Sequence, residues 1–306
     1  MVRCKYQIVI CLLSYGFSAL GQSLITVTPS SQPPKLADVI QKINASIVRV
    51  TATFSYQEQE DPNLTSGLRR TPLDLSAPVQ EGPNETLTWT TAGTGFIIDS
   101  DGHIVTANHV ISPRFNQQAA ENALKKAGRI LGPGSFQHAT ITVILQGPHL
   151  EQDVHGNEYY DQAAKVFKKD ERLDIAILTC GRNLLSTFSD LIPPLNLPEF
   201  QKGTPHSGDA VSVSGFPTTG GSDAGNLTTN TGFVSNSSFK DARGRTFYLA
   251  DVGVNHGDSG APVFINTSGR IIGLVDAYVA INGINQGRIE IVPISQILDL
   301  LPSTAR

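Results

Sequence analysis

The sequence predicts an all-β protein, and three observations support this expectation. Short apolar or alternating runs recur along the 306 residues, and few segments show a helical period. The 28 glycines and 18 prolines separate these runs and mark turns. An apolar content of 40% with 16% charged residues is ordinary for a packed globular chain, and the length allows one or two domains.

The amino terminus has the pattern of an export signal. A basic start precedes the mostly apolar run 8–20, and the small residues at 19–21 predict cleavage between Gly21 and Gln22. The apolar run is shorter than a typical transmembrane span, although an uncleaved membrane anchor is the alternative. We therefore expect residues 1–21 to be a signal peptide and the protein to be exported, either periplasmic or secreted.

The segment after this signal predicts a lead, a helix, a strand and a long loop. Residues 22–35 are polar and bear prolines, which is typical of a flexible lead. Apolar residues at helical spacing predict a short helix from Leu36 to Ile43, and the alternation at 47–53 predicts the first strand. Residues 55–91 carry four prolines and no clear period, so we expect an inserted loop there.

Further along, short strands dominate. Residues 93–110 predict two strands around an Asp-Ser-Asp-Gly hairpin turn, followed by a loop that presents His109. Within an insertion at 113–131, residues 115–131 carry an apolar stripe that predicts a helix. Other strands are expected at 141–145, 163–167, 173–178, 208–217, 231–235, 245–250 and 263–265, with a final helix at 294–301.

The hexapeptide 257–262, Gly-Asp-Ser-Gly-Ala-Pro, has the pattern of a nucleophile turn. Glycines on both sides of the Asp258–Ser259 pair allow a tight backbone that other residues would strain. The backbone N–H groups of Gly257 and Ser259 could then converge on a developing oxyanion. Because such turns also occur in ordinary loops, this motif needs support from elsewhere in the chain.

That support comes from a histidine and an aspartate upstream. A serine nucleophile needs a base to take its proton, and the base needs a carboxylate that fixes its tautomer. His109 follows a predicted strand, and Asp174 opens the apolar strand that ends at residue 178. Alone, Asp174 is more simply a cap or turn residue. Together with Ser259, the order His, Asp, Ser favours a catalytic triad.

On these motifs the sequence resembles the protease domain of the HtrA (DegP-like) branch of trypsin-fold serine peptidases. The resemblance covers roughly residues 36–300 and is strongest at 93–99, 104–111, 169–178, 251–262 and 269–275. It implies a trypsin-like double six-stranded β-barrel, with His109, Asp174 and Ser259 as the triad. HtrA members usually have Asn before the nucleophile and Gly-Gly after it, whereas this chain has Asp258 and Gly260-Ala261.

The resemblance also implies a domain plan. Residues 36–180 would form the first barrel with the two insertions 55–91 and 113–131, and 181–200 would connect it to the second. Residues 201–306 would hold the second barrel and a C-terminal helix. No segment for a PDZ domain is expected. Insertions such as the first can contact neighbouring subunits in the family, so a homo-oligomer is compatible with the resemblance.

The primary specificity pocket is expected around four residues. In trypsin-fold enzymes its base lies about six places before the nucleophile, here at Gly253, and its wall would come from Asp276, Ala277 and Tyr278. Without a charge at its base, the pocket should accept small or medium apolar side chains, because an unpaired buried cation is costly. If the Asp276 carboxylate points into the pocket, basic side chains would be favoured instead.

Composition argues against several other function classes. A net charge of −4 without a basic run argues against nucleic-acid binding. No histidine pair has metal-ligand spacing with a third ligand, so neither a metal nor another cofactor is expected. Only Cys180 lies after the predicted signal, so we expect no intramolecular disulfide and a buried, apolar role for this thiol.

Two functions remain. The first is an endopeptidase that hydrolyses unfolded or exposed segments of protein or peptide substrates through an acyl-enzyme. The second is a catalytically silent trypsin-fold binding or scaffold protein. Activation by a new amino terminus is not expected, because no Ile-Val-Gly-Gly segment lies upstream of the domain. Asp258 should therefore pair with another group or face solvent.

Overall fold

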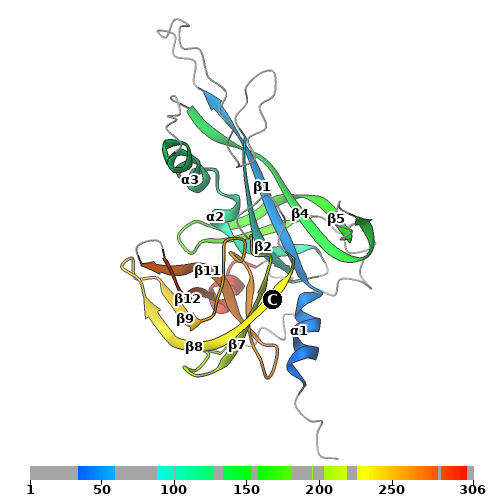
Figure 1. The fold of residues 1–306 in the computed structure, drawn as a ribbon, viewed down its shortest axis with the longest axis vertical. Coiled ribbons are helices and arrows are strands. Elements are labelled where there is room, and N and C mark those ends of the chain that lie inside the picture. Colours follow the sequence, from blue (N-terminus) through cyan, green and yellow to red (C-terminus); the bar gives the residue numbers. More distant parts are fainter. Residues whose placement is uncertain are drawn as a thin grey trace, which may run out of the picture. The chain divides into compact units, whose positions relative to one another are not determined.

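Two closed antiparallel β-barrels of six strands each make up the fold (Figure 1). The strand order is β1-β2-β3-β6-β5-β4 in the first barrel and β10-β11-β12-β9-β8-β7 in the second. The computed structural model describes residues 34–58, 88–99, 101–126, 134–152, 158–180, 195, 203–218, 226–281 and 284–301. The predicted all-β class and double six-stranded barrel are confirmed.

In each barrel the first three strands and the last three strands pair in sequence order, and the two sets of three are joined by pairs that are not consecutive in sequence, β3 with β6 and β1 with β4 in the first barrel and β9 with β12 and β7 with β10 in the second. The strands of the first barrel are β1 (Ile47–Glu58), β2 (Thr88–Ile97), β3 (His103–Ala107), β4 (Gly134–Gln152), β5 (Glu158–Asp170) and β6 (Ile175–Thr179). Those of the second are β7 (Ala210–Gly215), β8 (Thr228–Lys240), β9 (Thr246–Asp251), β10 (Pro262–Ile265), β11 (Ile271–Ile281) and β12 (Ile284–Pro293).

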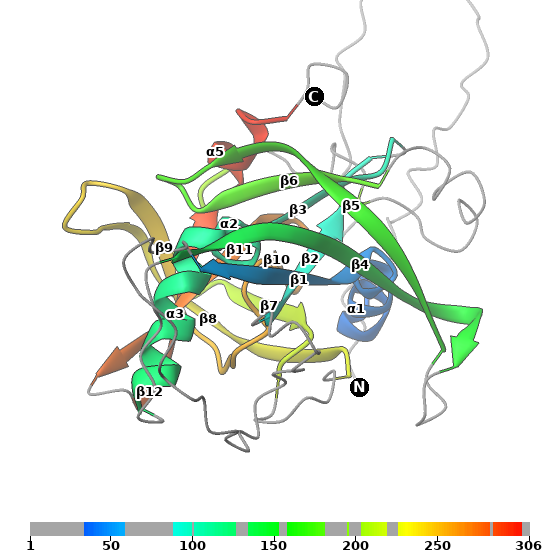
Figure 2. The ribbon, with the colours of Figure 1, turned by 90° about the horizontal axis from the view of Figure 1, so that it is seen from above.

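The alternation in β1 shows how sequence sets this architecture. Val48, Val50, Ala52 and Phe54 are fully buried, while the residues between them are half-exposed, as expected for a strand with one face in a core. Pairing of β1 with β2 on one side and β4 on the other leaves no free edge. Figure 2 shows β1, β4 and β5 side by side along this barrel.

Four helices flank the barrels in the described residues. They are α1 (Leu36–Asn44), α2 (Asn108–Ile111), α3 (Pro113–Lys126) and α5 (Ile294–Leu298). The predicted amphipathic helix near the start is α1, which buries Val39 and Ile43. The insertion helix begins at Pro113, two residues earlier than expected, because proline is well suited to the first helical position. The final helix ends at Leu298 instead of residue 301.

Strands extend further than the apolar pattern predicted. The ladder between β1 and β2 continues to Ser55 and Thr88, inside the predicted 55–91 loop, and β4 and β5 are much longer than the runs 141–145 and 163–167. Pairing between strands satisfies backbone hydrogen-bonding groups even where the side chains are polar. The strands therefore continue beyond the residues whose apolar side chains alternate. The predicted signal peptide, most of the lead, and the connector except Leu195 lie outside the described residues.

An apolar core joins the two barrels. The cluster that fills the first barrel continues into Phe216, Phe247 and Phe264 of the second, and a separate cluster fills the second barrel. The two halves are therefore packed against each other through large aromatic side chains, which fixes the loops at their junction. None of the helices in the described part of the chain has the length and apolar character needed to cross a membrane.

Candidate active site

His109 lies on the short helix α2, directly after the buried strand β3. Val110 and Ile111 are buried and anchor this single turn in the first barrel, whereas the His109 side chain is 21% exposed. A helix of four residues has little stability of its own, so packing holds it. The imidazole is thus fixed by apolar neighbours and still reachable from solvent.

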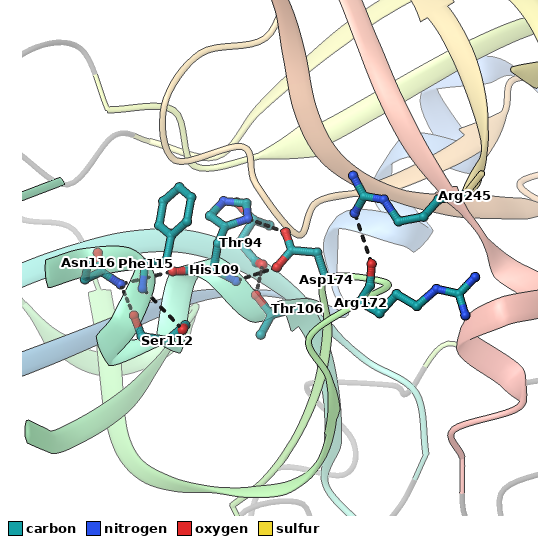
Figure 3. Close-up of polar contacts among 9 residues, drawn as sticks. All are labelled: Thr94, Thr106, His109, Ser112, Phe115, Asn116, Arg172, Asp174 and Arg245. Atoms are coloured by element: carbon teal, nitrogen blue, oxygen red, sulfur yellow. Dashed lines mark hydrogen bonds and ion pairs between the residues drawn. The ribbon is translucent and has the colours of Figure 1, made fainter. Parts of the chain in front are cut away.

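Asp174 holds this histidine through two hydrogen bonds (Figure 3). Its Oδ1 accepts the backbone N–H of His109 at 2.8 Å, and its Oδ2 lies 2.5 Å from His109 Nδ1. The carbonyl of Asp174 also accepts the N–H of Asn108 at 3.0 Å. An ionised carboxylate only accepts hydrogen bonds, so Nδ1 carries the proton and Nε2 is left as the acceptor.

The backbone of Asp174 has a φ of +56°, in the left-handed region that few non-glycine residues occupy. Aspartate tolerates this region better than most residues. The strained turn is tied to the second barrel, because Arg245 Nη1 donates to the carbonyl of Arg172 at 3.1 Å (Figure 3). The same guanidinium donates through Nε to Asp241 at 2.7 Å.

The insertion helix α3 supports the histidine from the other side. The carbonyl of Ser112 accepts the Asn116 N–H at 3.1 Å, and its hydroxyl lies 3.5 Å from the Phe115 N–H. Asn116 Nδ2 donates to the carbonyls of His109 and Ser112 at 3.0 and 2.9 Å. This geometry places the Phe115 ring 5.2 Å from the His109 ring, with 55% of the phenylalanine exposed (Figure 3).

Ser259 lies on a turn that only glycine permits at two positions. Gly257 and Gly260 have φ of +95° and +87°, and a Cβ on either would lie 2.2 Å from a backbone carbonyl oxygen, that of Phe216 or Thr94. Within the described residues, neither the Gly257 nor the Ser259 amide donates to a backbone carbonyl. Both predicted oxyanion donors are therefore left available.

Thr94 on β2 connects this turn to the first barrel. Its N–H donates to the Ser259 carbonyl at 2.8 Å, and its hydroxyl donates to the Gly257 carbonyl at 2.7 Å. The same hydroxyl accepts the N–H of Phe216 at 2.9 Å, and the Thr94 carbonyl accepts the hydroxyl of Thr106 at 2.7 Å. Thr94 is fully buried, so all four bonds are made away from water.

Asp258, the residue before the serine, is buried, with 2% of its surface exposed. Its Oδ2 accepts the N–H of Asn255 at 2.9 Å, so it pairs with another group and does not face solvent. Burial raises the pKa of this carboxyl to about 6, and the Asn255 N–H opposes that rise.

Asp276, one of the residues predicted for the pocket wall, contacts Asp174. Its side chain is hydrogen-bonded to that of Asp174 and is buried. Burial and the neighbouring Asp174 carboxylate raise the pKa of Asp276 to about 9. Burial also acts to raise the pKa of Asp174, but the hydrogen bonds from His109 and Asp276 outweigh it and hold that pKa below its usual value.

The other predicted pocket residues lie around the nucleophile turn. Gly253 is exposed between two buried valines, and a Cβ there would meet nothing within 4 Å. Ala277 is exposed on β11. The Tyr278 hydroxyl lies 3.2 Å from His256 Nε2, with the two rings edge to face at 5.6 Å. The carbonyl of His256 accepts the Thr218 N–H at 2.6 Å, which braces the start of the turn.

His109, Asp174 and Asp276 form the one group of three potential metal ligands found in the described residues, with ligand atoms within 4.8 Å of one another. These side chains are linked by hydrogen bonds from histidine to carboxylate and from carboxyl to carboxylate.

Elsewhere, burial raises the pKa of the Cys180 thiol to about 12, which keeps it protonated and unreactive at neutral pH.

The predicted residues His109 and Asp174 are in contact and Ser259 lies on the predicted glycine turn, whereas two supporting residues were not predicted. Thr94 lay inside a recognised motif, but only the fold reveals that its hydroxyl reaches the second barrel. Phe115 began the predicted insertion helix, directly after the histidine motif, which was the available signal.

Comparison with known proteins agrees with this fold. A solved structure described as the HtrA-type protease AlgW with decapeptide shares the fold, with a TM-score of 0.53 and 17% identity over 87% of this chain. The matched region is 66% of that protein's length, just under two thirds. A comparison with curated proteins gives no match. Residues 93–274, more than half of the chain, match the family description "Trypsin-like peptidase domain", and the chain therefore belongs to this family.

Proposed function

We propose that this protein is an HtrA-like serine endopeptidase that cleaves peptide bonds through an acyl-enzyme. The observation that carries the proposal is the contact between His109 Nδ1 and Asp174 Oδ2, at 2.5 Å, beside a glycine turn that bears a serine. Ser259 would be the nucleophile, His109 the general base and then acid, and Asp174 the group that orients the imidazole.

The proposed reaction follows from these roles. The Ser259 hydroxyl attacks the substrate carbonyl while its proton passes to His109 Nε2, and a C–O bond forms. The amides of Gly257 and Ser259 stabilise the oxyanion of the tetrahedral intermediate. His109 then protonates the leaving amine as the C–N bond breaks. Water hydrolyses the resulting ester by the same proton transfers in reverse order, which regenerates the serine.

A catalytically silent binding protein is the alternative. A fluorophosphonate probe separates the two, because it labels only a serine whose base and oxyanion donors are in place. We expect stoichiometric labelling of the intact protein and none of Ser259→Ala. Absence of labelling in the wild-type protein, at a pH where it is folded, would favour the binding protein and reject the endopeptidase.

The substrates we propose are unfolded or exposed protein segments, cut after small or medium apolar residues such as Ala, Val or Leu. The open space at Gly253 between Val252 and Val254 supports a pocket without charge at its base. The Asp276 carboxyl, which contacts Asp174, is not free to receive a basic side chain. Digestion of a peptide library tests this preference, and a majority of cuts after Lys or Arg would contradict it.

We also propose that the protein is exported after cleavage between Gly21 and Gln22 and is active without a further propeptide cut. The sequence pattern at 8–21 supports export, and the engagement of Asp258 with Asn255 supports an active turn that needs no new amino terminus. Amino-terminal sequencing of the exported protein, followed by the labelling assay, tests both. Activity confined to a form truncated near residue 90 would contradict the second.

A further inference from the structure

Asp276 occupies an unusual position in β11. The pairing of β11 with β12 shifts register between Val275 and Ala277, so Asp276 is the extra residue of a β-bulge. Bulges change the direction of a side chain relative to its neighbours. Here the bulge gives a strand of the second barrel a buried carboxyl, one oxygen of which lies within 4.8 Å of a carboxylate oxygen of Asp174 in the first barrel, and the two side chains are hydrogen-bonded.

Two carboxyl groups that share a hydrogen bond must share a proton, because carboxylates are acceptors only. Asp174 accepts two hydrogen bonds from His109, one from the backbone and one from the ring, and these favour its ionised form. Among the described residues, no backbone N–H and no basic side chain donates a hydrogen bond to the Asp276 carboxyl. The proton of the pair therefore resides on Asp276, which donates to Asp174.

The surroundings of Asp276 agree with this placement. The charged and titratable groups that face it are His109 from α2, Asp174 from the turn before β6, Arg245 from the residue before β9, and Glu290 from β12. Burial, Asp174 and Glu290 all favour the neutral form of Asp276, and Arg245 alone opposes them. With a pKa of about 9, the carboxyl is protonated at neutral pH.

We propose that Asp276 is a positioning residue that stays protonated and donates a hydrogen bond to Asp174, holding that carboxylate against His109. This inference rests on the proposed function. Loss of the Asp276 proton would place a second negative charge against Asp174 and replace the hydrogen bond with repulsion. The histidine would then lose its orientation, so activity should fall as the pH rises past the titration of Asp276.

Replacement of Asp276 by Asn tests the proposal, because the amide donates a hydrogen bond and cannot ionise. The kcat/KM of Asp276→Asn at pH 7 should stay close to that of the wild type. Asp276→Ala should lose roughly tenfold to a hundredfold, as expected for a lost hydrogen bond to a charged group. Between pH 8 and pH 10 the wild type should lose activity by about tenfold, whereas Asp276→Asn should not show this loss.

A matched control is Asp209→Asn, the same change at a turn before β7, which should keep the wild-type pH profile. The inference is overturned if Asp276→Asn keeps the alkaline loss, if it is as impaired as Asp276→Ala at pH 7, or if Asp276→Ala is fully active.

A second readout does not need activity. The carboxyl carbon of Asp276, followed by ¹³C NMR in the wild-type protein, should show the protonated form at pH 7 and titrate on the alkaline side. A carboxylate signal at pH 7 would overturn the inference even if the alanine variant is impaired. Should the wild type fail to react with fluorophosphonate while this signal is protonated, the proposed function fails and the carboxyl pair stands.

Discussion

The two barrels position their candidate catalytic residues by different means. In the first barrel, Asp174 adopts a strained φ of +56° and is held by the hydrogen bonds that it accepts from Asn108 and His109. In the second barrel, Gly257 and Gly260 take positive φ where their backbone lies too close to its neighbours for any Cβ. The first barrel uses a side chain for which we propose a chemical role, and the second uses glycines, which have no side chain.

Because of this difference, substitutions in the two sets of residues should have different effects. A substitution at Asp174 or His109 should change the chemistry while leaving the barrel folded, because both side chains are partly exposed and neither belongs to the apolar core. A substitution at Gly257 or Gly260 should instead force two packed backbone segments apart. Substitutions at Asp174 or His109 are therefore measured by activity, and substitutions at the two glycines by stability.

The largest effect is expected from the triad itself. His109→Ala and Ser259→Ala should each lower kcat/KM on the order of 10⁴-fold or more. The double variant should be no worse than the more impaired single variant, because residues that act as a unit are not additive. Hydrolysis of a peptide substrate, with circular dichroism to confirm folding, provides the measurement. Appreciable proteolysis in purified Ser259→Ala would contradict the assignment, and so would losses that multiply.

The second-largest effect distinguishes the cost of a steric clash at a glycine from the cost of its strained backbone conformation. Gly260→Ala would place a Cβ 2.2 Å from the Thr94 carbonyl and should lower the free energy of unfolding by about 3–5 kcal/mol. Gly208 has a similar φ of +94° but open space around it, so Gly208→Ala should cost only about 1–2 kcal/mol. Urea unfolding measures both. Equal losses would mean that strain alone governs these glycines.

The candidate catalytic residues of the two barrels also show how much of the site could be predicted from the sequence. His109, Asp174 and Ser259 each stand in a local pattern that carries information, namely a hairpin, the mouth of a strand and a glycine turn. The double barrel followed from the resemblance that these patterns established. Local pattern and family likeness therefore sufficed to predict the fold and to nominate a triad, which stays a prediction.

Contacts between residues distant in sequence were beyond that reasoning. Whether Asp276 lines a pocket or contacts Asp174 depends on a bulge in β11, and a bulge depends on register with β12, which no local pattern encodes. The long ladders of β4 and β5 arise from pairing between polar segments, where alternation gives no signal. The role of Thr94 could not be predicted for a related reason, since the two partners of its hydroxyl, Gly257 and Phe216, come from the second barrel.

Thr94 offers a third test, of the link between the barrels. Thr94→Val removes the hydroxyl that serves the Gly257 carbonyl and the Phe216 N–H, leaving two buried polar groups unsatisfied, and should cost about 2–4 kcal/mol of stability. Fluorophosphonate labelling should also slow, because the turn loses an anchor. Thr94→Ser should retain both properties. Thr53→Val is the control, since within the described part of the chain that exposed hydroxyl bonds only Thr90 on the neighbouring strand. An equal loss there would contradict the prediction.

The smallest effect concerns the pH dependence of stability, through Asp258. Burial raises the pKa of this carboxyl from 3.8 to about 6 in the folded protein, so folding takes up a proton between those values. The stability that it contributes is fully present below about pH 4 and is lost as the pH rises through 6. Asp258→Asn stays neutral and can still accept the Asn255 N–H. The variant should therefore match the wild type near pH 4 and be more stable by about 1–3 kcal/mol at pH 7.

Urea unfolding of both proteins at several pH values measures this difference directly. Asp276 is present in both and its contribution cancels, so the change between pH 4 and pH 7 reports Asp258 alone. A constant difference across that range would mean that the carboxyl titrates normally in the fold. A variant less stable at pH 7 would mean that the ionised form of Asp258 stabilises the nucleophile turn. In that case the second barrel, like the first, would rely on a charged side chain as well as on its glycines.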